Sequence, residues 1–156
     1  MNRQSTGFII LTLVIAVLLT IFALPMWLRW IWPDFVLLIL IYWSLHIETR
    51  SGIFTAWIMG IILDIFGGTL LGEHALALTI VIYLIFKLQK QIRVFPLSQQ
   101  AGVIFVASIL YLAIVYWVQG AISAAPNSFL FWVPIVTNTL LWPWLSMWLQ
   151  KFRTTR

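Results

Sequence analysis

The stretch that decides the fold is residues 99–122, which read QQAGVIFVASILYLAIVYWVQGAI. None of these 24 residues carries a formal charge. An α-helix rises about 1.5 Å per residue, so a helix of this length exceeds the roughly 30 Å hydrocarbon core of a bilayer. The stretch is therefore predicted to be a transmembrane helix.

Five further apolar stretches lie on either side of it, and the chain is predicted to be one all-α membrane domain, residues 1–156, packed as a compact bundle. The second and third stretches are short for a complete span, so local bilayer thinning, re-entrant ends or deep loops are expected there. The six predicted transmembrane helices are residues 8–28, 33–47, 52–66, 70–88, 99–122 and 129–149.

The overall composition supports a membrane protein, because 63% of the residues are hydrophobic and only 8% are charged. A soluble domain carries about a quarter charged residues. The net charge of +5 does not indicate nucleic-acid binding, since the basic residues form short clusters between apolar runs. The absence of cysteine excludes disulfides and thiolate metal sites.

The basic residues also predict orientation, because cytoplasmic loops of membrane proteins are enriched in Lys and Arg. If both termini lie in the cytoplasm, Arg29 is the one basic residue predicted to lie outside the cell membrane, against eight predicted to lie inside. The first apolar stretch is too long for a typical signal peptide and is interpreted as a retained helix. The residues expected inside are Arg3, Arg50, Lys87, Lys90, Arg93, Lys151, Arg153 and Arg156.

No catalytic, cofactor or metal constellation is found, and the chain is interpreted as a non-enzyme. The two histidines, His46 and His74, are predicted to lie on opposite membrane faces, so they cannot share a metal ion. No nucleophile or base stands beside an orienting group.

The segment from Gly60 to His74 contains the most informative polar residue. Asp64 lies four residues after Gly60, so both share one helix face. A carboxyl group within a span is costly and is expected to face the bundle interior or a wet cavity. Gly67 and Gly68 are expected to end the helix in a tight outer turn. Three roles for Asp64 remain open: capping of that turn, binding of a partner or lining of a cavity, and proton or ion coupling.

Asn138 is a second polar residue within a predicted span, and Pro134 and Pro143 flank it. Each proline removes a backbone hydrogen bond and favours a kink. Asn138 is therefore expected to satisfy a freed carbonyl locally, with bonding to a neighbouring helix as the alternative. Most of the ten tryptophans are assigned to interfacial belts, among them Trp43, Trp142 and Trp144.

Three motifs resemble the MreD family of bacterial rod-shape proteins, in register along the whole chain. Trp32-Pro33-Asp34-Phe35, with the apolar run after it, resembles the family's second span. The family's glycine–aspartate segment resembles Gly60-Ile-Ile-Leu-Asp64, followed by Thr69-Leu-Leu-Gly72. Its ending resembles Asn138-Thr-Leu-Leu-Trp142-Pro143-Trp144. The candidate structural or partner-binding residues are Pro33, Asp34, Gly60, Asp64, Gly67, Gly68, Gly72, Asn138, Trp142 and Pro143.

The resemblance implies an inner-membrane subunit that binds MreC directly. Through MreC it would join MreB, RodA and the elongation-specific penicillin-binding transpeptidase. The implied role is support of side-wall peptidoglycan synthesis, with no cofactor, no nucleic acid and membrane lipid as the surroundings. The fold also resembles the substrate-binding subunits of energy-coupling-factor transporters. A small-molecule-binding subunit of such a transporter is therefore the alternative function.

Overall fold

The structure is a computed structural model that describes residues 6–22, 24–47 and 50–154. All regular structure in these ranges is helical. The short helices α2 (Met26–Arg29) and η1 (Phe129–Trp132) lie in connections. The longer helices are α1 (Thr6–Ile21), α3 (Phe35–His46), α4 (Ser51–Gly67), α5 (Glu73–Ile92), α6 (Leu97–Ala121) and α7 (Val133–Thr154).

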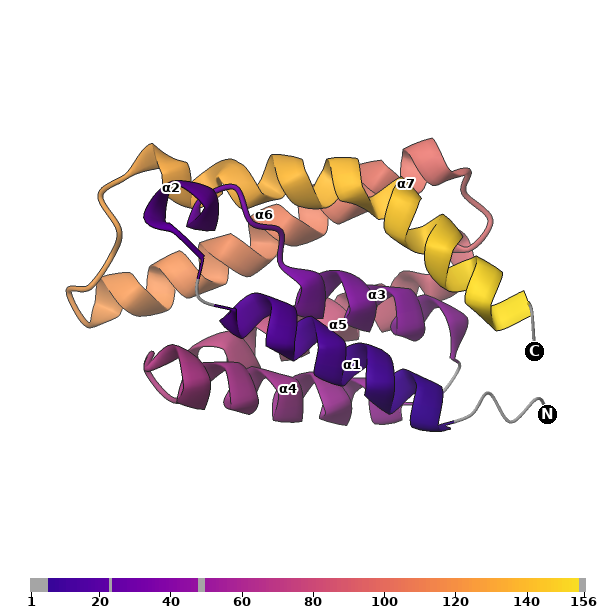
Figure 1. Ribbon diagram of the computed structural model, residues 1–156, viewed down its shortest axis with the longest axis horizontal. Coiled ribbons are helices and arrows are strands. Elements are labelled where there is room, and N and C mark those ends of the chain that lie inside the picture. The colour runs from indigo at the N-terminus through magenta and orange to yellow at the C-terminus, as the bar shows by residue number, and fades with distance from the viewer. Residues whose placement is uncertain (1–5, 23, 48–49, 155–156) are drawn as a thin grey trace.

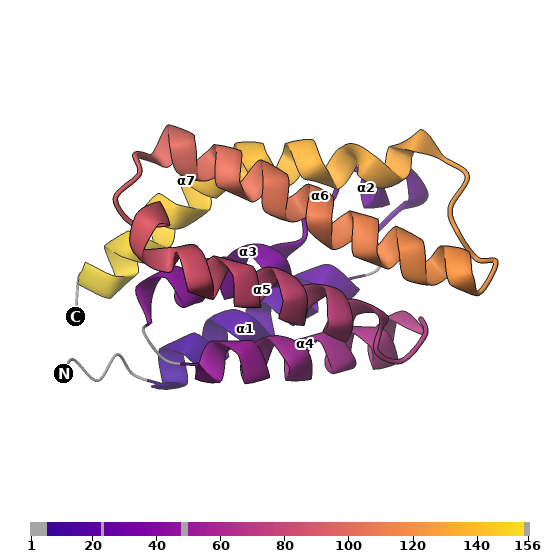
Figure 2. The ribbon, with the colours of Figure 1, turned by 180° about the vertical axis from the view of Figure 1, so that it is seen from behind.

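The longer helices run back and forth between the two ends of an elongated bundle (Figure 1). The start of α1 and the end of α7 lie at one end, which we call the terminal end. The other end, called the turn end, holds α2, the turn between α4 and α5, and the connection from α6 to η1. Figure 2 shows from behind that α4 and α5 lie side by side and that α6 packs along α7.

The core of the bundle is α3, because every residue from Val36 to Leu45 is buried. This helix contacts α1, α4, α5 and α7. A helix that is apolar on all sides can face either lipid or a protein core. The run VLLILIYWSL has that composition, and the four helices that α3 contacts place it in the core.

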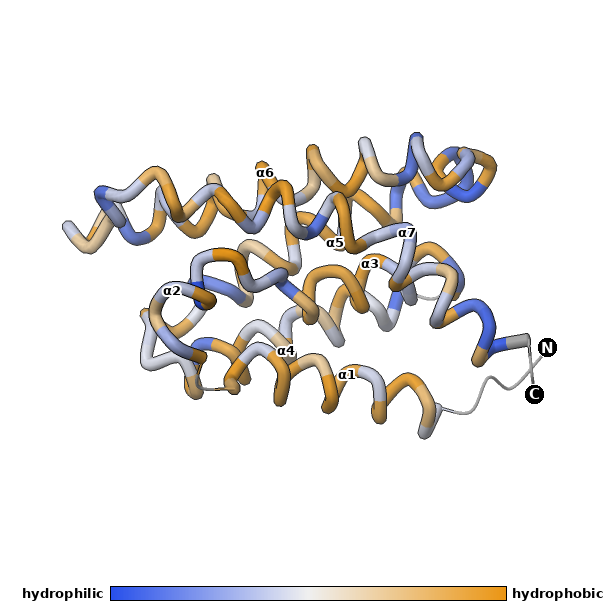
Figure 3. The backbone as a smooth tube through the Cα atoms, turned by 45° about the horizontal axis from the view of Figure 1, so that its top comes forward, coloured by the Kyte–Doolittle hydropathy of each residue, from blue (hydrophilic) through white to orange (hydrophobic). Residues whose placement is uncertain are grey.

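The outward faces of the helices are also apolar, as expected for a protein whose solvent is lipid. Leu18 on α1, Val106 on α6 and Leu140 on α7 are each more than 60% exposed. Figure 3 shows hydrophobic residues along most of α1 and α6. Within the described residues, three segments are long and apolar enough to cross a bilayer: Glu73–Ile92, Leu97–Ala121 and Phe129–Arg153. The helices α1, α3 and α4 have 16, 12 and 17 residues and are shorter.

Three predicted boundaries, in the first and fourth spans, are wrong. The span expected over residues 8–28 ends at Ile21, and Pro25 precedes the separate short helix α2. The span expected to begin at residue 70 begins at Glu73, because Gly72 has a φ of +102° that a helix cannot contain. The same helix continues to Ile92, beyond the expected end at residue 88.

The last predicted span, residues 129–149, divides into η1 and α7. Pro134 lies in the first turn of α7, where no backbone bond is lost, whereas Pro143 lies inside the helix. Figure 1 shows that α7 bends along its length, and Pro143 accounts for a bend there. Arg3 and Arg156, which contribute to the predicted orientation, lie outside the described residues.

The interfacial assignment is wrong for two tryptophans. Trp142 is 0% exposed, and its indole nitrogen donates to Gln100 Oε1 at 3.4 Å. Trp43 is buried and donates to Thr12 Oγ1 at 3.0 Å. Trp144, by contrast, is 73% exposed, as an interfacial residue would be. Sequence alone cannot separate these cases, because an indole suits both a polar interface and a core that offers one acceptor.

Candidate functional site

The turn between α4 and α5 depends on two glycines with positive φ. Gly68 has a φ of +63° and follows the last helical residue, Gly67. The Gly68 and Thr69 amides both donate to the Asp64 carbonyl, which is a glycine-ended helix C-cap. Gly67 itself has ordinary helical geometry, so the break that was expected at both glycines is made by Gly68. Gly72, with its φ of +102°, then directs the chain into α5.

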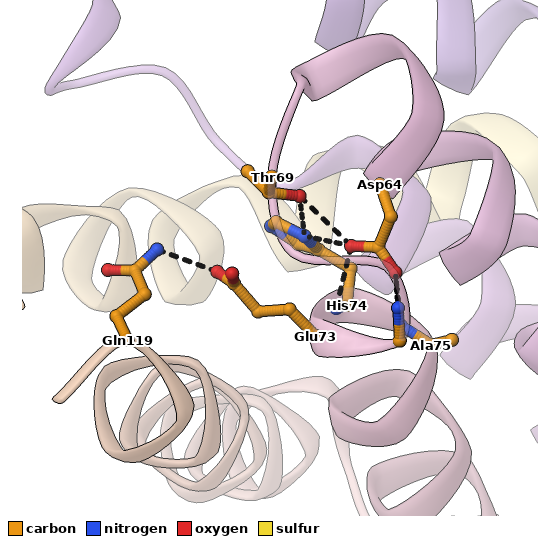
Figure 4. Close-up of polar contacts among 7 residues, drawn as sticks. Asp64, Thr69, Glu73, His74, Ala75 and Gln119 are labelled. Atoms are coloured by element: carbon orange, nitrogen blue, oxygen red, sulfur yellow. Dashed lines mark hydrogen bonds and ion pairs between the residues drawn. The ribbon is translucent and has the colours of Figure 1, made fainter. Parts of the chain in front are cut away.

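The Asp64 side chain caps the N-terminus of α5, although it belongs to α4. Its two carboxylate oxygens accept the backbone amides of Gly72 at 2.8 Å, His74 at 2.9 Å and Ala75 at 3.4 Å. The first amides of a helix lack partners within the helix. Gly72 occupies the N-cap position but has no side chain to supply one. Figure 4 shows Asp64 facing the first turn of α5.

Two side chains complete the surroundings of Asp64, which is 1% exposed. Thr69 Oγ1 donates to its Oδ1 at 3.1 Å, and His74 Nδ1 lies 2.8 Å from the same oxygen. These contacts join the end of α4, the turn and the start of α5 into one hydrogen-bonded unit. Of the three roles left open for Asp64, the hydrogen bonds show capping, and the capped groups are amides of α5.

Gly60 allows α4 to approach the start of α5 closely enough for this cap to form. A Cβ atom at Gly60 would lie 2.2 Å from Ala75 Cα and 2.4 Å from Ala75 N. Both atoms belong to the backbone, so no side-chain rotation could relieve the overlap. The seam of small residues formed by Ala56 and Gly60 thus brings Asp64, one turn further along α4, within reach of the α5 amides.

Asn138 on α7 forms a second polar contact, with the segment that begins α3. Its Oδ1 accepts the Asp34 backbone amide at 2.8 Å, and its Nδ2 donates to Asp34 Oδ2 at 3.1 Å. The same amide group donates to Ser108 Oγ on α6 at 3.1 Å. The expectation that Asn138 satisfies a carbonyl of its own helix is therefore wrong, and the alternative of bonding to neighbouring helices is correct.

Glu73 and Gln119 make a third contact, between α5 and α6. Gln119 Nε2 donates to Glu73 Oε1 at 2.6 Å (Figure 4), and Glu73 is only 2% exposed. The ring of Tyr111, also on α6, lies 6.2 Å from the ring of His74 and is 3% exposed. We refer to these three contacts and their neighbours as the polar cluster. Its members are Asp34, Asp64, Thr69, Glu73, His74, Ser108, Tyr111, Gln119 and Asn138.

The structure brings some of the predicted site residues into the cluster and leaves others outside it. Asp34, Asp64 and Asn138 belong to the cluster, and Gly60, Gly68 and Gly72 shape the backbone around Asp64. Pro33 lies beside the cluster, half-buried, immediately before Asp34. Trp142 instead bonds to Gln100, which contacts the backbone at the α5–α6 connection, and Pro143 bends α7.

The predicted site residues left out six members of the cluster: Thr69, Glu73, His74, Ser108, Tyr111 and Gln119. Gln119, near the end of its predicted span, donates to the buried Glu73. Tyr111 and Gln119 are eight residues apart on α6, which places them near one face of a helix. That spacing was the signal from which a polar face on α6 could have been predicted. An acidic residue at the start of α5 was the possible hydrogen-bond partner of that face.

The sequence matches one known protein family along almost its whole length. The profile of the family described as "rod shape-determining protein MreD" matches residues 1–152. The chain belongs to the MreD family. It is 29% identical over 143 residues to the rod shape-determining protein MreD of Haemophilus influenzae, covering 90% of this chain and 86% of that protein. No solved structure matches the chain, so the expected likeness to transporter subunits stays a prediction.

Membership of the MreD family, together with the apolar helices, makes the chain a rod shape-determining membrane protein. The three motifs quoted above are thus features of a chain that matches an MreD protein along nearly its whole length. Two of them, Asp34 with its neighbours and Asn138 with its neighbours, meet in space through hydrogen bonds although they are 104 residues apart.

Proposed function

We propose that this MreD-family protein is a non-enzymatic inner-membrane subunit of the cell-elongation complex. In this role it binds MreC and supports side-wall peptidoglycan synthesis together with MreB, RodA and the elongation-specific transpeptidase. The observation that carries the proposal is the match of the family profile to residues 1–152. The polar cluster supports a structural role, because most of its hydrogen bonds join one helix to another rather than present groups to a substrate.

The contacts of Asp64 support a structural role for this residue. Both Asp64 oxygens are occupied by amides and side chains, so Asp64 has no free oxygen with which to act as a base. A protein that holds helices in fixed positions is better suited to assembly than to catalysis.

The proposal includes six membrane crossings with both termini in the cytoplasm. The alternation of the long helices between the two ends of the bundle supports it (Figure 1). The short α3 can take part because it is enclosed by other helices and does not itself face lipid. The bias of basic residues then places the terminal end, with Lys90, Arg93 and Lys151, in the cytoplasm.

Reporter fusions test this orientation. A fusion after Arg156 and one within residues 87–93 are expected to report the cytoplasm, and one at residues 126–128 the periplasm. A periplasmic signal from residues 87–93 would overturn the proposed crossings. The membrane fraction of each fusion, measured by immunoblotting, serves as the control for correct insertion.

The proposed function predicts that depletion of the protein converts rod-shaped cells into round ones. The tagged protein, purified in mild detergent, is expected to bring MreC with it and to show no hydrolase or transferase activity. Mass spectrometry of the co-purified proteins and microscopy of depleted cells provide the measurements. Normal rods after deletion, with an ATPase pair in place of MreC in the purified complex, would contradict the proposal.

The hollow between α6 and η1 gives the transporter alternative no support. One hollow of about 460 Å³ opens on the surface between α6 and η1. Its lining is small and aromatic and provides no charged group to recognise a polar vitamin: Ala113, Tyr116, Trp117, Gly120, Ala121 and Trp132. We therefore propose the assembly role alone.

A further inference from the structure

The end of α6, at the turn end of the bundle, has two sides of different character (Figure 2). On the inner side, Val115 is 3% exposed and Gln119 donates to the buried Glu73. On the outer side, Tyr116 is 40% exposed and Trp117 is 72% exposed. Both of these aromatic residues line the hollow of about 460 Å³. The hollow therefore opens away from the bundle, toward the lipid that surrounds the protein.

Contacts between aromatic rings hold the wall of the hollow in place. The Tyr116 and Trp132 rings lie 5.8 Å apart, and the Phe131 ring lies 6.0 Å from the first and 5.4 Å from the second. Three rings in mutual contact restrict one another's rotation, so the wall does not fold inward. Small residues form the floor, where a Cβ atom at Gly120 would meet only Ala125 Cβ, at 4.0 Å. The hollow is therefore formed before any ligand binds.

The chemistry of the lining determines which ligand fits the hollow. Its lining residues, all within the described part of the chain, include no charged side chain. Water in a cavity needs about two to four polar partners, whereas apolar cavities stay dry and accept apolar ligands. A cavity of about 150 Å³ accepts benzene, so a hollow of about 460 Å³ has room for roughly 18 apolar carbons. One acyl chain of a membrane phospholipid has that size.

A transmembrane helix of a partner fits the hollow less well than an acyl chain does. The lining residues on α6 run from Ala113 to Ala121, which is a rise of about 12 Å. A helix that crosses the roughly 30 Å hydrocarbon core would contact the hollow over less than half of its length. A flexible chain, by contrast, bends to fill a short hollow and makes the dispersion contacts that an empty hollow lacks.

We propose that the hollow between α6 and η1 binds one acyl chain of a membrane phospholipid. The chain lies between the aromatic wall and the floor of small residues. Because no charged side chain lines the hollow, the fit of the chain determines binding and the charge of the head group does not. In the proposed orientation, this lipid belongs to the outer leaflet of the inner membrane. The site itself is independent of the assembly role.

The test is native mass spectrometry of the purified full-length protein in detergent. The protein is first depleted of lipid and then supplied with dioleoyl phosphatidylcholine or dioleoyl phosphatidylglycerol. We expect each chain to retain one phospholipid, with similar affinity for the two head groups. A preference of about tenfold or more for the anionic lipid would show that a basic group binds the head group, and it would overturn the proposal.

Gly120→Leu fills the hollow from its floor. It is expected to lower phospholipid retention by at least about fivefold, because the chain would then be forced into an overpacked site. Gly102→Leu is the matched control, since it makes the same change on α6 at a glycine that has open space around it and lies outside the hollow. This control is expected to retain phospholipid as the wild type does. The Tm of each variant verifies that it is folded.

Three results would contradict the acyl-chain site. One is a wild-type protein that retains no phospholipid, and another is equal retention by Gly120→Leu and Gly102→Leu. The third is loss of MreC from the purified complex in Gly120→Leu with phospholipid retention unchanged, which would assign the hollow to a partner's helix. If Gly120→Leu does not accumulate, Ala121→Leu, which fills the same floor, takes its place in the comparison.

Discussion

Gly60→Ala is expected to destabilise the bundle by at least about 3 kcal/mol and to reduce the folded protein recovered from membranes. The added Cβ would lie 2.2 Å from Ala75 Cα, so α4 must move away from the start of α5. That movement would also withdraw Asp64 from the α5 amides. The measurement is Tm in detergent, together with the monodisperse fraction in size-exclusion chromatography.

Gly102→Ala provides the matched control for this substitution. Gly102 lies in α6 with open space around it, so alanine is expected to be neutral or slightly stabilising through its higher helix propensity. A further variant tests the cause, because the atoms that meet the new Cβ are backbone atoms. Gly60→Ala combined with Ala75→Gly is therefore expected to be no better than Gly60→Ala alone. Rescue by the second substitution would show that the backbone contact is not the reason.

Asp64→Leu is expected to have the second largest effect, a loss of about 3 kcal/mol or more. It leaves the Gly72 and His74 amides buried without acceptors, and it removes a negative charge from the N-terminus of α5. The expected observations are a lower Tm and reduced abundance in the membrane fraction. Normal abundance and full rod-shape function would show that the cap is unimportant.

Asp64→Asn removes the negative charge of the side chain but keeps its shape, so it separates the contributions of charge and shape to stability. If Asp64 only capped the turn through one acceptor, this change would be nearly silent, because the amide keeps one oxygen. Five hydrogen bonds to the two oxygens change that expectation, because an amide retains one acceptor and directs its NH2 group at amide donors. A loss of about 1–2 kcal/mol is expected, intermediate between wild type and leucine. Thr69→Val, which removes one donor, is the control and is expected to cost about 1 kcal/mol or less.

The glycine–aspartate segment shows how far sequence reasoning extends into the site. Helix periodicity placed Gly60 and Asp64 on one face, and the low polarity of the surrounding span predicted that Asp64 faces the interior. The cap at the turn was one of three roles left open. The groups that it caps could not be predicted, because the backbone amides of Gly72, His74 and Ala75 carry no residue-specific signal in a sequence.

Asn138 and the buried tryptophans show where local reasoning fails. Pro134 and Pro143 favoured a local carbonyl as the partner of Asn138, yet its partners are Asp34 and Ser108 on other parts of the bundle. Tryptophan is a residue type that is common at the membrane interface. Trp43 and Trp142 are instead buried, each beside one hydrogen-bond acceptor. In each case the partner comes from a distant helix, so its identity depends on how the helices pack.

The sequence by itself was enough to show that lipid surrounds most of this protein and to indicate the family to which it belongs. A chain with 63% hydrophobic and 8% charged residues cannot cover a water-facing surface, and three motifs in register indicated the MreD family. Tertiary structure alone decided that α3 is enclosed and that Asp34 and Asn138 meet through hydrogen bonds. The physical reason is that the summed composition of a chain shows whether lipid surrounds it. Which helix is enclosed and which polar groups meet depend on packing that no single helix encodes.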